Sequence, residues 1–108
     1  MTNSRQDNLQ CEIIKGDCET YLKNKISKID LSFLDPPFNQ DKEYNSHDDN
    51  MPEAEYWDWM TRVCKLIYQK TANGGAIYFM QREKNTKFVL EVLSKSGWTF
   101  QNLIIWRK

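Results

Sequence analysis

The residues with the clearest chemical potential are Asp35, Pro36, Pro37 and Phe38, which directly follow an apolar run that ends at Leu34. Neither proline can donate a hydrogen bond to a neighbouring strand, and each ring fixes its own φ at about −65°, so a strand must end here. Residues that precede a proline are also held in extended conformations. The sequence therefore predicts a stiff rim with one carboxylate and one exposed ring. Our hypothesis is that this rim holds a flipped-out nucleotide base.

The composition indicates one soluble domain of modest size. The chain has 108 residues, 40% of them hydrophobic and 28% charged, with 15 basic and 15 acidic side chains. This balance provides no basic field, which counts against autonomous binding of nucleic acid. Cys11, Cys18 and Cys64 lack the spacing of metal ligands, so we expect no metal. Without an apolar run of roughly 20 residues or a signal peptide, we expect a cytoplasmic protein that binds no membrane.

The hydrophobic pattern predicts strands that alternate with helices. Strands are expected at 11–15, 29–34, 76–80 and 98–106, and helices from 18, from 52 and over 83–96. Such alternation gives a mostly parallel sheet with helices on both faces, and ligands bind at the carboxyl ends of its strands. The polar side chains expected at those ends are Asp17, Asp35, Gln81 and Arg82.

Turn and capping residues set the expected limits of the helices. Asp17 is suited to cap the first helix, and Asp49 or Asn50 the second. Asn73-Gly74-Gly75 is expected to end the second helix, and Gly97 the third, because glycine accepts a positive φ. Residues 40–50 are polar and predict a long loop without regular structure, typical of a lid or a disordered segment.

The chain resembles the amino-group DNA methyltransferases that use S-adenosylmethionine. Asp35-Pro36-Pro37-Phe38 is similar to their Asp/Asn/Ser-Pro-Pro-aromatic signature, and Asp is more typical of enzymes acting on adenine N6 than on cytosine N4. Three further segments resemble the family in the family's order: Gly16-Asp17-Cys18, the segment from Asn73 to Phe79, and the segment from Asn102 to Lys108. The resemblance implies a partial doubly wound, Rossmann-like α/β fold and a role in DNA methylation, such as restriction-modification.

Methylation of an exocyclic amine requires its lone pair to be aimed at the sulfonium methyl group of the cofactor. The Asp35 carboxylate and the Pro36 carbonyl can accept the two amine hydrogens while Phe38 stacks on the base, so positioning dominates the chemistry. The expected catalytic residues are Asp35, Pro36, Pro37 and Phe38; cofactor binding is expected at Asp17, Cys18 and Asp35, and substrate binding at Phe38, Asn39 and Tyr44.

Each of these assignments has a simpler alternative. The two prolines could only end a strand, Asp17 could only cap a helix, and Tyr44 could lie in an ordinary exposed loop. Gly74-Gly75 is not accompanied by a phosphate-binding motif, so we interpret the pair as a helix stop. A carboxylate and two prolines alone would be weak support, and the four ordered segments together favour the catalytic interpretation.

The glycine-rich turn with which this family holds S-adenosylmethionine has no counterpart in the sequence. We therefore expect a flexible N-terminus at 1–10 and, at 11–108, the N-terminal portion of a permuted methyltransferase domain that is inactive alone. DNA is the expected partner of the complete enzyme, with a possible C-terminal complementing segment or subunit. The alternatives are a non-catalytic remnant that pairs with a second methyltransferase chain, and a methyltransferase acting on RNA or protein amines.

Overall fold

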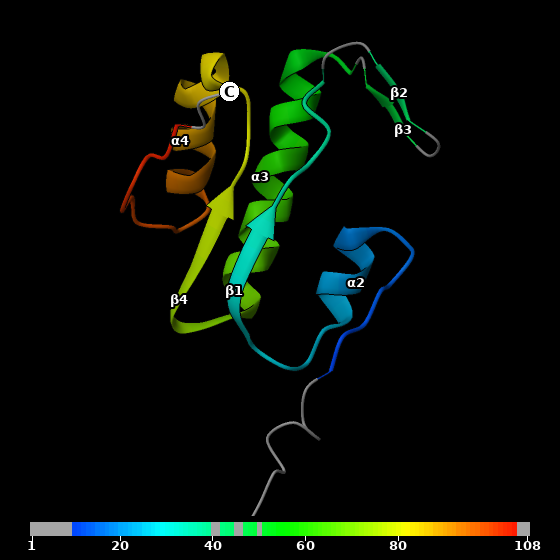
Figure 1. Cartoon of the computed structure of the whole chain (residues 1–108), viewed down its shortest axis with the longest axis vertical. Helices are drawn as coiled ribbons and strands as arrows, with labels where there is room; N and C mark the ends of the chain where they lie inside the picture. The colour runs from blue at the N-terminus through cyan, green and yellow to red at the C-terminus, as the bar shows by residue number, and fades with distance from the viewer. Residues whose placement is uncertain (1–9, 40–41, 45–46, 50, 106–108) are drawn as a thin grey trace, which may run out of the picture.

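The computed structural model of the chain describes residues 10–39, 42–44, 47–49 and 51–105. Two parallel strands lie side by side, with the long helix α3 behind them and the helices α4 and α2 to the left and right (Figure 1). The elements in chain order are α2 (Cys18–Asn24), β1 (Ile29–Leu34), β2 (Lys42–Tyr44), β3 (His47–Asp49), α3 (Glu53–Lys70), β4 (Thr71–Phe79), the short 3₁₀ helix η1 (Glu83–Asn85) and α4 (Thr86–Lys95).

Strands β1 and β4 are a parallel pair joined by a crossover that contains α3. Leu31 pairs with Ala76 and Leu34 with Phe79, so the two strands end together. The predicted strand at 29–34 is confirmed residue for residue. The predicted strand at 76–80 is confirmed in position, although β4 begins earlier, at Thr71.

The register between the two strands shifts near their start, where β4 contains two adjacent glycines. Gly74 has a φ of +84°, which residues with a Cβ rarely adopt. A Cβ on Gly75 would lie 2.9 Å from the backbone oxygen of Asp30. Both glycines are therefore required by the backbone inside β4, and they do not form the predicted helix stop.

The core forms where one face of α3 meets the strands and the other helices. Leu34 of β1 and Ile77 of β4 pack against this face. Full burial of a Val, Leu, Ile, Met or Phe side chain contributes roughly 1.5–3 kcal/mol to the stability of the fold. The buried apolar residues are Tyr56, Met60, Val63, Cys64 and Ile67 of α3, Leu22 of α2 and Val92 of α4.

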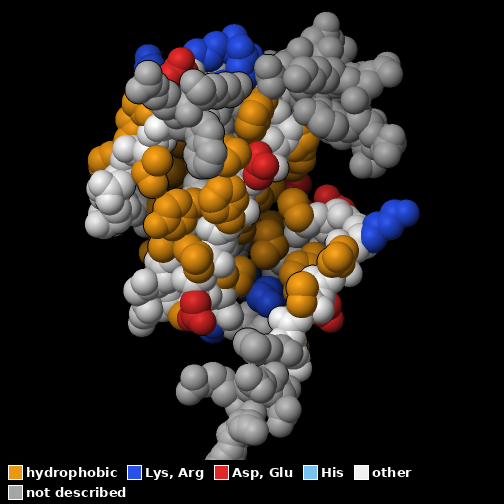
Figure 2. Space-filling model, in the orientation of Figure 1, with side chains coloured by type: hydrophobic (Ala, Val, Ile, Leu, Met, Phe, Trp, Pro, Cys, Tyr) orange, Lys and Arg blue, Asp and Glu red, His pale blue; other side chains and the backbone are white. Residues whose placement is uncertain are grey.

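The opposite face of the β1–β4 pair is uncovered in the part of the chain that the structure describes. Leu31, Phe33 and Tyr78 are 62%, 65% and 49% exposed, and the rings of Phe33 and Tyr78 stack at 6.2 Å. Figure 2 shows hydrophobic side chains gathered in the middle of this view. The α/β class with a parallel strand pair is thus confirmed, with the described helices packed against one face.

Two of the predicted strands are absent from the described residues. Segments 11–15 and 98–105 have no regular structure, and most of their apolar side chains are exposed, with Ile13 at 96% and Ile104 at 69%, whereas Trp98 is half-buried and packs against the core. A segment becomes a strand only when a neighbouring strand completes its backbone hydrogen bonds. Neither β1 nor β4 pairs with these segments, so the hydrophobic pattern alone does not make them strands. Trp106 lies outside the described residues.

The region predicted as an unstructured loop contains a small hairpin. Strands β2 and β3 pair antiparallel, with Glu43 opposite Asp48, so this polar segment satisfies backbone hydrogen bonds locally. The prediction of a long loop without secondary structure over 40–50 is therefore wrong for the described part of that range.

The limits of the helices follow from their capping residues. Asp17 accepts a hydrogen bond from the backbone nitrogen of Thr20 at 3.1 Å, which confirms it as the N-cap of α2. Pro52, and not Asp49, occupies the N-cap position of α3, without a side-chain cap; Asn50 is outside the described residues. Helix α3 ends at Lys70 because Thr71 is already extended. The predicted stop at Gly97 is confirmed by its φ of +107°.

The burial of Cys64 provides a test of this core. Cys64 is fully buried, and burial raises the pKa of its thiol to about 12, whereas Cys11 and Cys18 are exposed. At about pH 8 only about one Cys64 thiol in ten thousand is ionised, and the thiolate is the reactive form. We expect an alkylating reagent to label Cys11 and Cys18 in the native chain and Cys64 only after denaturation, as measured by peptide mass spectrometry.

The matched control is the double variant Cys11→Ser, Cys18→Ser, in which Cys64 is the remaining cysteine. Its labelling rate should rise steeply with denaturant. Labelling of Cys64 in the native double variant as fast as in denaturant would contradict the described core.

Candidate active site

The predicted rim lies at the carboxyl end of β1, directly beside the end of β4. The backbone nitrogen of Met80 donates to the oxygen of Leu34 at 2.8 Å, so strand pairing continues to the residue before Asp35. Asp35 is exposed, while Pro36, Pro37 and Phe38 are half-buried. Among the described residues, none forms a hydrogen bond or an ion pair with the Asp35 carboxylate. The carboxylate is therefore available to a ligand.

The backbone of the rim is held by a buried tyrosine of α3. The hydroxyl of Tyr56 donates to the carbonyl oxygen of Pro37, and it accepts a hydrogen bond from Nε2 of Gln81 at 2.9 Å. Tyr56 is 1% exposed, and Gln81 lies two residues past the end of β4. The segments that follow the two strands are thus joined through the first half of α3.

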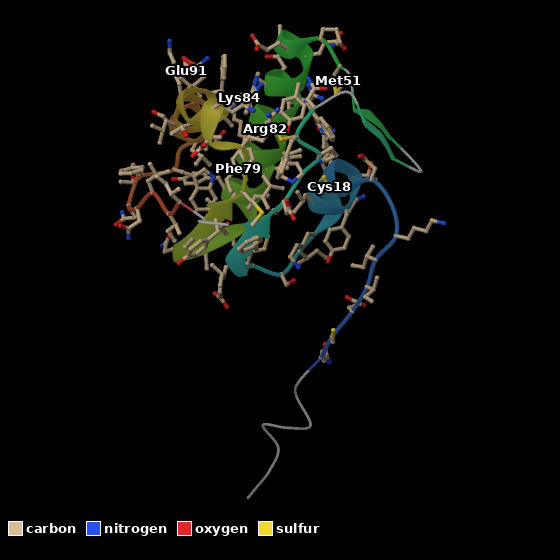
Figure 3. All side chains as sticks on the ribbon, turned by 45° about the horizontal axis from the view of Figure 1, so that its top comes forward. Cys18, Met51, Phe79, Arg82, Lys84 and Glu91 are labelled. Carbon is tan, nitrogen blue, oxygen red and sulfur yellow. The ribbon has the colours of Figure 1, made fainter. Side chains whose placement is uncertain are left out.

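Gln81 is itself held in one orientation by its neighbours. Its side-chain oxygen accepts hydrogen bonds from the backbone nitrogen of Arg82 at 3.1 Å and from Nδ2 of Asn85 at 3.3 Å. The amide nitrogen of Gln81 therefore points toward Tyr56. In Figure 3 Arg82 can be found just past the end of β4.

Asn39 directly follows the rim and closes the loop that carries β2 and β3. Its Nδ2 donates to the backbone oxygen of Met51 at 2.8 Å, and its Oδ1 accepts from the backbone nitrogen of Met51 at 2.7 Å. Asn39 has a φ of +60°, a conformation that asparagine tolerates better than most residues. The side chain thus holds the base of the hairpin in place; a direct contact with substrate stays a prediction.

The predicted cofactor residues Asp17 and Cys18 lie at the start of α2, which is also toward the end of the molecule where β1 finishes (Figures 1 and 3). The Asp17 carboxylate also accepts from the hydroxyl of Thr20 at 3.0 Å. Partial burial raises the pKa of the Cys18 thiol, and the carboxylates of Asp17 and Glu19 raise it further. Within the described residues, no hydrogen bond connects Asp17 or Cys18 to the rim.

The structure therefore joins the Asp35–Phe38 rim, at the Pro37 carbonyl, to Tyr56, which the sequence patterns did not assign to the site. Through Tyr56 it joins the rim to Gln81, which those patterns placed at the carboxyl ends of the strands. Tyr56 has no assigned role in the sequence patterns, yet a buried tyrosine needs a partner for its hydroxyl, and that need could have indicated a hydrogen bond here. The bond between Asn39 and Met51 has no comparable sequence signal. Tyr44 is in β2, and its side chain is outside the described set.

Other features of the described residues point to no second site. A shallow hollow between α2 and α3 is lined by residues such as Glu19, Lys23, Arg62 and Lys65, and it includes no residue of the rim. In the same part of the chain, no cluster of three or more Cys, His, Asp or Glu side chains is arranged to hold a metal ion. None of the described helices has the length and apolar character needed to cross a membrane.

The chain belongs to the DNA methylase family of amino-group methyltransferases. The sequence profile of that family matches residues 29–108, which include both strands, the rim and α3. Together with the parallel β1–β4 pair, this match confirms the predicted partial Rossmann-like methyltransferase fold. The resemblance drawn from the motifs is therefore also confirmed.

Individual relatives agree with the family assignment. The DNA adenine methyltransferase YhdJ of Escherichia coli is 27% identical over 95 residues, which cover 87% of this chain and 32% of the relative. The type II methyltransferase M.HpaI of Haemophilus parainfluenzae is 30% identical over 87 residues, covering 79% of the chain and 28% of the relative. The ribosomal RNA large subunit methyltransferase K/L of Colwellia psychrerythraea is 30% identical over 89 residues, which cover 82% of this chain and 12% of the relative.

The chain thus spans about a third or less of the length of these three relatives. No solved structure matches the chain.

The two hydrogen bonds between Asn39 and Met51 should stabilise the loop that carries β2 and β3. Asn39→Ala removes both hydrogen bonds and places a Cβ-bearing residue without a polar side chain at positive φ, so we expect the free energy of unfolding to fall by about 1–3 kcal/mol. We also expect the amide of Met51 to exchange its hydrogen faster, as measured by hydrogen exchange with NMR detection.

Asn39→Gly is the matched control, because glycine accepts the positive φ but cannot form the two bonds. The Met51 amide should exchange its hydrogen faster in both variants, whereas the backbone strain of a positive φ at position 39 should be present only in Asn39→Ala. An unchanged exchange rate of Met51 in both variants would contradict the role assigned to the Asn39 side chain.

Proposed function

We propose that a protein containing this chain transfers a methyl group from S-adenosylmethionine to the N6 amine of an adenine flipped out of DNA. The observation that carries the proposal is the accessible Asp35 carboxylate at the end of β1, in a rim whose backbone is fixed at Pro37 by Tyr56. The family membership of the chain supports methyl transfer to an amino group as the class of reaction.

The roles of the rim residues follow from the chemistry of an exocyclic amine. Conjugation with the ring delocalises the nitrogen lone pair, so the amine must be held with its hydrogens bound and its lone pair directed at the methyl group. The Asp35 carboxylate accepts one hydrogen and the Pro36 carbonyl accepts the other. Phe38 stacks on the base, which offsets part of the few kcal/mol needed to flip it, since such stacking contributes about 1–3 kcal/mol.

Adenine is preferred over cytosine because the first residue of the motif is Asp. The relative YhdJ is named as a DNA adenine methyltransferase, which supports the same choice. One relative is named as a ribosomal RNA methyltransferase, so activity on RNA should be measured beside activity on DNA. The cytoplasm is the proposed location, as predicted from the sequence.

The described residues do not by themselves fit S-adenosylmethionine. The Asp17 carboxylate is engaged in capping α2, and the sequence contains no glycine-rich turn between a strand and a helix. When bound, the cofactor supplies the electrophilic methyl group. We propose that residues beyond these complete its pocket, with Asp17 and Cys18 at its border.

A second candidate function is that of a subunit or remnant that pairs with another methyltransferase chain. The uncovered face formed by Leu31, Phe33 and Tyr78 favours this function, because exposed apolar sheet faces are usual sites of association. The two candidates differ in whether Asp35 is needed for methyl transfer by the assembled protein.

The first test of the proposal replaces the carboxylate. In the complete enzyme, or in the chain complemented by a C-terminal segment, Asp35→Ala should lower methyl transfer at least about 100-fold, because it removes an acceptor that acts at the reacting amine. The measurement is incorporation of labelled methyl groups into DNA, followed by nucleoside analysis for methylated adenine and cytosine, with RNA as a second substrate.

Asp30→Ala is the matched control, because Asp30 is also an exposed carboxylate of β1 but lies at the opposite end of the strand. It should retain activity, and both variants should melt at the temperature of the wild type. Full methyl incorporation by Asp35→Ala would remove Asp35 from its role, and label found on cytosine would overturn the choice of adenine.

The second test concerns the cofactor. Calorimetric titration of S-adenosylmethionine into the 108-residue chain should give no binding in the micromolar range, because the described residues do not enclose the cofactor. Micromolar binding by this chain would contradict the proposal that other residues complete the pocket.

A further inference from the structure

A line of hydrogen bonds connects the rim to the segment after β4 through the buried Tyr56. We infer that Tyr56 is a positioning residue, oriented by Gln81, that sets the Pro37 peptide and thereby the backbone position from which the Phe38 ring projects. The inference rests on the proposed function, because the ring matters for catalysis only if a base stacks on it.

The backbone between Asp35 and Phe38 has few torsions left to fix. The rings of Pro36 and Pro37 hold their φ angles, and the ψ of Pro36 is restricted because a proline follows. The ψ of Pro37 remains, and rotation about it moves the Pro37 carbonyl together with the whole of Phe38. A hydrogen bond from Tyr56 to that carbonyl therefore fixes the one backbone torsion that the two prolines leave soft before Phe38, and only the torsions of Phe38 itself then set its ring.

The Tyr56 hydroxyl has a well-defined position and a well-defined direction. Its ring meets Trp57 edge-on at 5.0 Å and Trp59 edge-on at 5.9 Å, which fixes where the hydroxyl oxygen lies. Gln81 donates to that oxygen, so the hydroxyl hydrogen is left to point at Pro37. Bonds in such a series polarise and strengthen one another.

Both flanks of the rim are anchored as well. The Leu34 oxygen is held by the Met80 nitrogen before the rim, and the Asn39 side chain is held by Met51 after it. Met51 lies just before α3 and Tyr56 in its first turn, so the segment around the start of this helix holds the chain on both sides of Phe38. Phenylalanine at position 56 would fill nearly the same volume of the core, so core packing alone does not require the hydroxyl.

The test compares two tyrosines of the same helix. Tyr56→Phe removes the hydroxyl that contacts Pro37, whereas Tyr68→Phe removes one that forms no hydrogen bond with the described residues. In the complete or complemented enzyme, Tyr56→Phe should lower kcat about five- to tenfold, the effect of one hydrogen bond, with the KM for S-adenosylmethionine unchanged. Tyr68→Phe should match the wild type.

A second measurement needs no activity and uses the full 108-residue chain. An HNCO spectrum links the amide of Phe38 to the carbonyl carbon of Pro37, whose chemical shift falls when a hydrogen bond to its oxygen is lost. We expect this shift to fall in Tyr56→Phe and to be unchanged in Tyr68→Phe. Gln81→Leu, which leaves the core intact, should move the Pro37 chemical shift in the same direction by a smaller amount. This variant replaces Tyr56→Phe in the measurement if Tyr56→Phe does not fold.

The outcomes separate this inference from the proposed function. If Asp35→Ala is inactive while Tyr56→Phe has the kcat of the wild type, the positioning role is wrong and the proposed function stands. An unchanged Pro37 signal in Tyr56→Phe, or in Gln81→Leu where that variant is used, would also overturn the inference. If the Pro37 signal moves but Asp35→Ala retains activity, the hydrogen bond exists and the proposed function fails.

Discussion

The burial of one face of α3 against the β1–β4 pair is the constraint on which the rest of the structure depends. The same face that buries Met60 and Cys64 also carries Tyr56, whose hydroxyl reaches the rim after β1. Hydrophobic burial is not directional, so it brings the helix to the sheet without fixing the site. Hydrogen bonds made at the end of that interface add the direction, because they are satisfied in only one arrangement.

The elements that the sequence predicts well are those whose signals are local or are completed within the described residues. The apolar run at 29–34 becomes β1 because β4 pairs with it, and Asp17 caps α2 with an oxygen of its own side chain. The equally apolar segments 11–15 and 98–105 are not strands, because strand formation depends on a neighbour and the pattern of one segment contains no information about that neighbour.

The candidate site divides in the same way. The rim could be located from Asp35 to Phe38, since two prolines after an apolar run restrict the backbone whatever surrounds them. Its support could be located only in part: Gln81 is expected at the same edge of the sheet, but its link to the rim passes through Tyr56, which is distant in sequence and reaches the rim only because α3 crosses behind the strands. Asn39 illustrates the limit: its hydrogen bonds to the backbone of Met51 have no signal in the sequence, and its contact with substrate stays a prediction.

Under the proposed function, the charge of the chain also bears on how the complete protein would bind DNA. With 15 basic and 15 acidic side chains the chain has no net charge, and phosphate contacts supply most of the sequence-independent affinity for DNA. A rim of one carboxylate and one ring can hold a base that is already extruded, but a carboxylate repels the phosphates that would bring the duplex to it. Affinity for the duplex must therefore come from cations placed away from Asp35. The fixed backbone of the rim then needs only to orient the base that those contacts deliver.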